Sequence, residues 1–79
     1  MEMKPVTSSQ IHAIGYDPAA KKLHVQFFQG KGADRGPGPI YEYDDITPDQ
    51  HSGLVGAESI GSHFGKHIKN NTAIKFRRL

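Results

Sequence analysis

Two tyrosines and a group of cations are the residues of this chain whose types and spacing best suit a chemical task. Tyr41 and Tyr43 alternate along one segment, and alternate residues of a strand share a face. Rings spaced in this way can stack on the bases of single-stranded RNA or DNA, while Lys and Arg side chains hold the phosphates. The candidate cations are Lys66, Lys69, Arg77 and Arg78. The alternative is that both rings pack under helices as part of the core.

The charge of the chain is distributed unevenly. The formal net charge is +2. Residues 1–58 contain all eight acidic residues and five of the ten Lys and Arg, whereas residues 59–79 contain the other five cations and no acid. This asymmetry indicates an anionic partner for the basic C-terminal third, although mixed surface charge also simply keeps small domains soluble.

A pair of histidines four residues apart is the candidate for a metal site. On a helix, the rings of His63 and His67 could both reach one ion. However, the sequence contains no cysteine, no glutamate lies between the two histidines, and a third ligand would have to come from His51 or a distant acid. We therefore expect two solvated histidines, with no metal and no cofactor.

No group of residues suits covalent or acid–base catalysis. Ser8 and Ser9 precede a predicted strand but lack the Gly-x-Ser-x-Gly turn that exposes a serine nucleophile. Asp44 and Asp45 are adjacent, so in a strand they would point to opposite faces and could not share a proton. The sequence thus predicts that the protein is not an enzyme.

Three strands are predicted from the alternation of apolar and polar residues. They span residues 9–16, 22–28 and 40–46. A bulge near Ala13, or a strand with both faces covered, would explain why the bulky Ile11 and Ile14 are an odd number of residues apart. The Gly- and Pro-rich residues 29–39 are interpreted as a flexible loop, and residues 1–5 as a frayed end.

Two short helices are predicted after the third strand. Thr47 and Gln50 form a capping-box signature for a helix over residues 48–57. Ser59 can cap a second helix that ends near Lys69. The apolar stripe of this second helix would consist of Ile60, Phe64 and Ile68.

The expected fold is α+β: a three-stranded antiparallel meander followed by two short helices on one face, with a possible extra C-terminal strand over residues 73–79. The 79 residues suffice for one domain, 1–79. No apolar run approaches the roughly 18 residues that a membrane helix needs. Because the chain also has no cysteine and no visible signal peptide, a cytoplasmic protein is expected.

Four short motifs occur in a fixed order along the chain. They are Val6-x-Ser8-Ser9-x-Ile11, Ile14-Gly15-Tyr16-Asp17, Tyr41-x-Tyr43 and Gly61-x-x-Phe64. In this order and spacing they resemble the KTSC domain, a small module named after the C-terminal segment of some lysyl-tRNA synthetases. The resemblance covers nearly the whole chain. It implies a small α+β domain and RNA binding, a role that has been suggested for the family.

The predicted function is that of a small non-enzymatic binding module for RNA or another single-stranded nucleic acid. Tyr41 and Tyr43 would stack on bases or support the sheet. Phosphate contacts would come from the four C-terminal cations, since Ile60 and Ser62 stand where KTSC domains often carry Lys and Arg. The alternative is a protein-interaction adaptor or inhibitor, such as a bacterial or phage regulator, that binds its partner through a sheet edge or the acidic first part of the chain.

Overall fold

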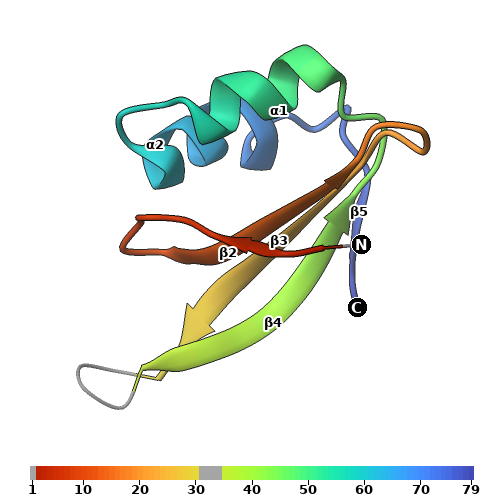
Figure 1. Cartoon of the computed structure of the whole chain (residues 1–79). Helices are drawn as coiled ribbons and strands as arrows, with labels where there is room; N and C mark the ends of the chain where they lie inside the picture. Colours follow the sequence, from red (N-terminus) through yellow and green to blue (C-terminus); the bar gives the residue numbers. More distant parts are fainter. Residues whose placement is uncertain (1, 31–34) are drawn as a thin grey trace.

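The computed structural model describes residues 2–30 and 35–79, which form a single twisted antiparallel sheet with helices on one side (Figure 1). The strands are β1 (Lys4–Pro5), β2 (Ile11–Asp17), β3 (Lys22–Gln29), β4 (Gly36–Tyr43) and β5 (Phe76–Arg78). The helical segments are α1 (Pro48–Val55), α2 (Ile60–Phe64) and a π-helical turn, η2 (Gly65–Lys69). The strand order is β1-β2-β3-β4-β5, so each strand pairs with its neighbours in the sequence. The fold is therefore α+β, as expected.

The central hairpin of β2 and β3 agrees with the predicted strands. Asp17 closes its turn, because the carboxylate accepts the backbone N–H groups of Ala19 and Ala20 at 3.0 and 3.3 Å. The register of β2 against β3 shifts between Ile11 and Ala13. The predicted bulge is confirmed, and it lets both Ile11 and Ile14 enter the core.

The possible C-terminal strand is present as β5, but the meander before it has four strands instead of the three predicted. The additional strand lies in the predicted frayed end. Lys4 and Pro5 pair with Ile14 and Ala13 as β1, so these two residues are not frayed, while residue 1 lies outside the described part of the chain. A two-residue strand has too little hydrophobic alternation to be seen in a sequence. It forms because β2 offers it a free backbone edge.

The prediction of a loop over residues 29–39 is wrong at both ends of that range. Gln29 still belongs to β3, and β4 already begins at Gly36, while residues 31–34 lie outside the described part of the chain. Gly38 shows why a strand can be rich in glycine, since a Cβ at this position would lie 2.8 Å from the backbone oxygen of Phe27. Only glycine allows the two strands to approach so closely here.

Both helices begin at the positions predicted from the capping residues in the sequence. The Thr47 side chain accepts the N–H of Gln50, and the Gln50 side chain accepts the N–H of Thr47, which completes a capping box for α1. Ser59 caps α2 through the N–H of Ser62 at 3.4 Å. The predicted second helix does reach Lys69, but its last five residues form the π-helical turn η2 instead of α-helix.

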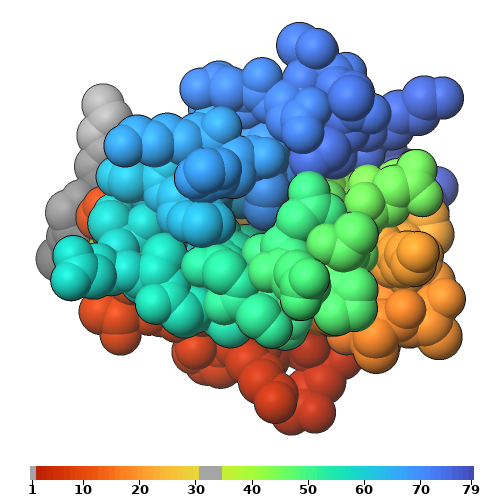
Figure 2. Space-filling view, turned by 90° about the horizontal axis from the view of Figure 1, so that it is seen from above, coloured from red at the N-terminus to blue at the C-terminus, as the bar shows by residue number. Residues whose placement is uncertain are grey.

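The core lies between the helices and the sheet face that they cover. Its fully buried side chains come from both layers: Ile11, Leu23, Val25, Ile46, Leu54 and Phe64. The predicted stripe of Ile60, Phe64 and Ile68 is buried against the sheet. Seen from above, the helical segments cover the middle of the sheet, with the red to orange residues at one margin and the blue C-terminal residues at the other (Figure 2). In the described residues, no helix has the length and apolar character needed to span a membrane.

Candidate nucleic-acid interface

An open pocket of about 490 Å³, lined largely by aromatic rings, lies on the helix-facing side of the sheet. Its lining comes from β3, β4, η2 and β5: Phe27, Pro39, Tyr41, Tyr43, Lys69 and Phe76. We call this set the aromatic pocket. Tyr41 and Tyr43 belong to it because they pair with Val25 and Leu23, whose side chains lie in the core on the same face. Strand alternation therefore places both tyrosines under the helices and not on the open face.

The rings of the aromatic pocket pack against one another and against Phe64 in stacked, tilted and edge-to-face pairs. The centroids of Phe27 and Tyr41 are 5.6 Å apart at an interplanar angle of 75°. Tyr43 stacks on Phe76 at 5.5 Å and meets the edge of Phe64 at 5.4 Å. These separations are typical of favourable aromatic pairs. The cluster is thus a rigid wall whose rings hold one another in place.

The rings differ in how much solvent they meet. Tyr43 is buried, with 5% of its surface exposed, Tyr41 is partly buried, and Phe76 is 62% exposed. Burial raises the pKa of the Tyr43 phenol to about 12, so this group is neutral at physiological pH. Tyr43 is therefore mainly a core residue, while Tyr41 and Phe76 form the accessible part of the wall.

The predicted cations divide between several places. Lys69 lines the aromatic pocket, and its side chain is exposed. Arg78 pairs with Tyr41 across β4 and β5, so the two side chains leave the sheet on the same face. Lys66 is exposed on η2 but does not line the pocket. Arg77 lies on the opposite face, because it is paired with Glu42.

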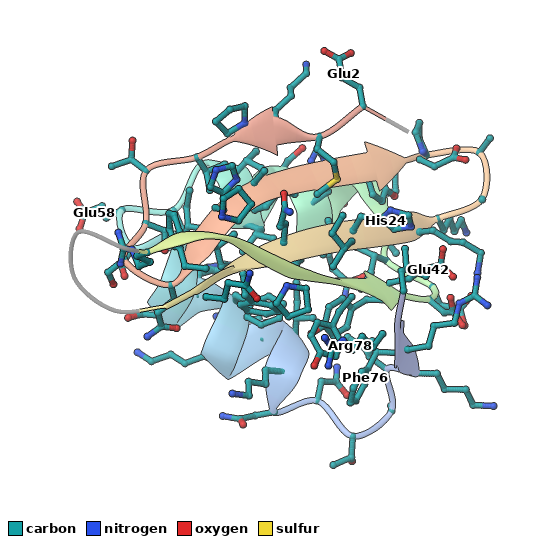
Figure 3. All side chains as sticks on the ribbon, turned by 90° about the horizontal axis from the view of Figure 1, so that it is seen from below. Glu2, His24, Glu42, Glu58, Phe76 and Arg78 are labelled. Atoms are coloured by element: carbon teal, nitrogen blue, oxygen red, sulfur yellow. The ribbon has the colours of Figure 1, made fainter. Side chains whose placement is uncertain are left out.

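The open face of the same strands carries a cluster of ions around Glu42. This carboxylate, on a residue only 7% exposed, accepts hydrogen bonds from His24 at 2.8 Å and Arg77 at 3.0 Å. Lys22 lies 3.6 Å from it and also bonds Asp44 at 2.7 Å. The hydrogen bond from His24 and the neighbouring Arg77 and Lys22 charges hold the pKa of Glu42 below its ordinary value. Figure 3 shows His24 and Glu42 side by side on this face.

Phe27 and Phe76 line the pocket but were not predicted from the sequence as site residues. Phe27 had a detectable signal, since it alternates with Leu23 and Val25 and so shares their face. Phe76 also had the right spacing in a possible strand, but the position of that strand beside β4 could not be read from the sequence. Sheet order alone brings Phe76 against Tyr43.

The two candidate metal-binding histidines lie elsewhere, in a depression between α1 and the α2–η2 segment. The ring centroids of His63 and His67 are 4.3 Å apart, and Asp49 lines the same shallow depression. Within residues 2–30 and 35–79, no group of three or more His, Cys, Asp or Glu side chains is arranged to hold a metal ion. The pair is separate from the aromatic pocket, and neither histidine is among the residues that line it.

A family model and a solved structure both identify this chain as similar to the KTSC domain. The model of the KTSC domain matches residues 7–71. An uncharacterized protein of Stutzerimonas stutzeri is 30% identical over 69 residues, which cover 87% of this chain and 86% of that protein. A protein of Tsukamurella paurometabola is 39% identical over 67 residues, which cover 85% and 88% of the two chains. The crystal structure of a KTSC domain protein from Yersinia pestis superposes with a TM-score of 0.80 and 31% identity, covering 99% of this chain and 96% of that one.

Proposed function

The chain belongs to the KTSC domain family, and from this premise we propose that it is a small non-enzymatic module that binds single-stranded nucleic acid, with RNA as the favoured ligand. The observation that carries the proposal is the aromatic pocket with Lys69 in its lining. The pocket combines a surface for a flat ring with a charge for a phosphate. Nucleotides present these two features together.

The shape of the aromatic pocket suits one nucleobase. Its volume of about 490 Å³ lies within the usual range for small-molecule sites. Tyr41 is partly buried and Phe76 is largely exposed, so both rings can present a face to a ligand without leaving the core. Stacking on such rings contributes about 1–3 kcal/mol per base and tolerates any base sequence.

The charge beside the rings distinguishes between classes of ligand. Aromatic pockets also bind quaternary ammonium groups, but Lys69 in the lining would repel a cation. Lys69 and Arg78, both exposed, instead favour an anion next to the rings. A ligand with a planar ring and a phosphate meets both conditions, whereas a simple apolar ligand would leave the cations unused.

Binding of fluorescein-labelled oligonucleotides, followed by fluorescence anisotropy, tests the proposal. Single-stranded RNA, single-stranded DNA of the same sequence and duplex DNA would be titrated at about 50 mM and about 200 mM salt. We expect single strands to bind more tightly than the duplex and affinity to fall with salt. Tyr41→Ala should weaken binding by about 1–3 kcal/mol through lost stacking.

A pair of lysine variants provides the matched control. Lys66 and Lys69 are both exposed on η2, but only Lys69 lines the pocket. Lys69→Gln should weaken binding and reduce the slope of log affinity against log salt by about one, while Lys66→Gln should change the slope less. The absence of binding at the lower salt concentration, or equal effects of the two variants, would refute the assignment of nucleic acid to this pocket.

A further inference from the structure

Strand β5 forms one edge of the sheet, and the backbone groups of two of its three residues face away from β4. The N–H of Asp44 donates to the oxygen of Lys75 at 2.9 Å, and the N–H of Leu79 donates to the oxygen of Ile40 at 2.8 Å. In an antiparallel ladder these bonds come from every second residue. The N–H and C=O groups of Phe76 and Arg78 therefore point outward, and no other described segment bonds to them.

The two edges of the sheet differ in how they are protected. At the other edge, β1 has only two residues, and one of them is Pro5, which has no N–H to offer. By contrast, β5 contains no proline and all three of its residues are exposed. Proline blocks the pairing of a further strand at β1, whereas β5 carries charges but no proline, so a strand of opposite charge can pair with its edge.

The side chains along β5 combine apolar and basic character. In the described residues, the large hydrophobic side chains that remain exposed are Val55, Phe76 and Leu79, and two of these three lie on β5 or directly after it. Phe76 stacks one side of its ring on Tyr43, yet 62% of the residue is exposed. The basic residues of this edge are Lys75, Arg77 and Arg78.

We propose that β5 is a docking edge for an extended acidic and apolar segment of a partner protein, which adds to the sheet as a further strand. The outward N–H and C=O groups of Phe76 and Arg78 would bond its backbone. An apolar side chain of the partner would cover Phe76. Arg77 bonds Glu42 through its Nε, so its terminal nitrogens can face a carboxylate of the partner on the open side.

The charge of the edge selects this partner over a second copy of the chain. Two β5 edges paired with each other would bring Lys75, Arg77 and Arg78 of one copy against the same three cations of the other. Like charges on neighbouring strands destabilise pairing. An acidic segment meets the same cations with opposite charge, so the edge repels its own copy and attracts a different chain.

Peptides with methylated backbone nitrogens test strand addition directly. The probe is a labelled peptide of alternating Glu and Val, with one version N-methylated at the odd positions and another at the even positions. Only one set of N–H groups can face β5, so one methylated version should lose about tenfold or more in affinity while the other keeps it. If both versions bind equally well, only charge attracts the peptide and strand addition is refuted.

Amide exchange on the ¹⁵N-labelled protein locates the bound peptide without any variant. The amides of Phe76 and Arg78 should gain protection when peptide is added, whereas those of Arg77 and Leu79 already bond β4 and should change little. Arg78→Gln should weaken peptide binding several-fold, with Lys66→Gln as the matched control on η2. Protection that appears at β1 or on the helices, or self-association of the chain through β5 in sedimentation, would overturn the proposal.

Discussion

The two faces of the β4–β5 pair are built from alternate residues of the same strands, yet they have opposite character. On the helix side, Tyr41, Tyr43 and Phe76 form an aromatic wall. On the open side, Glu42 and Arg77 form an ion pair with a distance of 3.0 Å. One residue of register separates an aromatic surface from a charged cluster.

This comparison shows that the presence of a charge does not make it available to a ligand. Arg77 belongs to the basic C-terminal third, but its Nε bonds the carboxylate of Glu42. Lys69 belongs to the same basic part of the sequence as Arg77, but its side chain is exposed and lies beside the rings of the aromatic pocket. On the open face, the bond between Arg77 Nε and Glu42 joins β5 to β4 and leaves only the terminal nitrogens of Arg77 for other contacts, whereas Lys69 lies exposed on the helix side.

Substitutions on the two faces should also lower the free energy of unfolding by different amounts. The largest loss is expected for a core residue on the helix side. Phe64 is 2% exposed and packs against both Phe27 and Tyr43. Phe64→Ala should reduce the free energy of unfolding by about 3–5 kcal/mol, because it removes buried apolar area and leaves a cavity under the pocket. Urea denaturation measures this loss. A loss below about 1 kcal/mol would show that the helix layer contributes little to holding the wall.

The open face should respond less strongly, and its response should depend on pH. Glu42→Gln removes the charge that His24, Lys22 and Arg77 share, while it keeps the shape of the side chain. Folding lowers the pKa of Glu42 from its ordinary value of 4.5. The stabilisation by the carboxylate is therefore fully present above about pH 4.5 and is lost as the pH falls through the folded pKa.

Thermal unfolding of wild type and Glu42→Gln at several pH values checks this prediction. The wild type should be the more stable protein near neutral pH, and the two midpoints should converge as the pH falls below 4.5 and through the lowered pKa of Glu42. Asp49→Asn, which removes an exposed acid from α1, serves as a control in a different region. A constant difference between wild type and Glu42→Gln over this range would mean that the ionised carboxylate is not what stabilises the open face.

The smallest expected effect concerns the phenol of Tyr43. Burial raises its pKa from 10.0 to about 12, so the folded protein should show a late step when tyrosinate absorbance is followed with rising pH. Tyr43→Phe should remove this step and change stability little at neutral pH, because the ring is kept. Since the unfolded chain releases this proton first, wild-type stability should fall as the pH rises above about 10. A Tyr43 titration near 10 would show that the wall is open to water.

Much of the fold could be predicted from local signals. The capping box at Thr47, the cap at Ser59 and the bulge near Ala13 were visible because each involves residues close together in the sequence. Strand β1 and the start of β4 at Gly36 were missed. Strand β1 depends on the backbone of β2 beside it, and the start of β4 depends on the close approach of two strands at Gly38. Neither feature leaves a hydrophobic pattern in the sequence.

The sequence by itself determined which residues share a face, because alternation in a strand depends only on spacing. It placed Tyr41 with Tyr43, and the structure keeps the two tyrosines on one face, opposite Val25 and Leu23. Only the tertiary structure decided which face this pair occupies and what lies opposite it. The sheet order sets β5 beside β4, which brings Phe76 into the pocket and Arg77 onto Glu42. The sheet order depends on contacts between residues far apart in the chain, and the local spacing of residues does not predict these contacts.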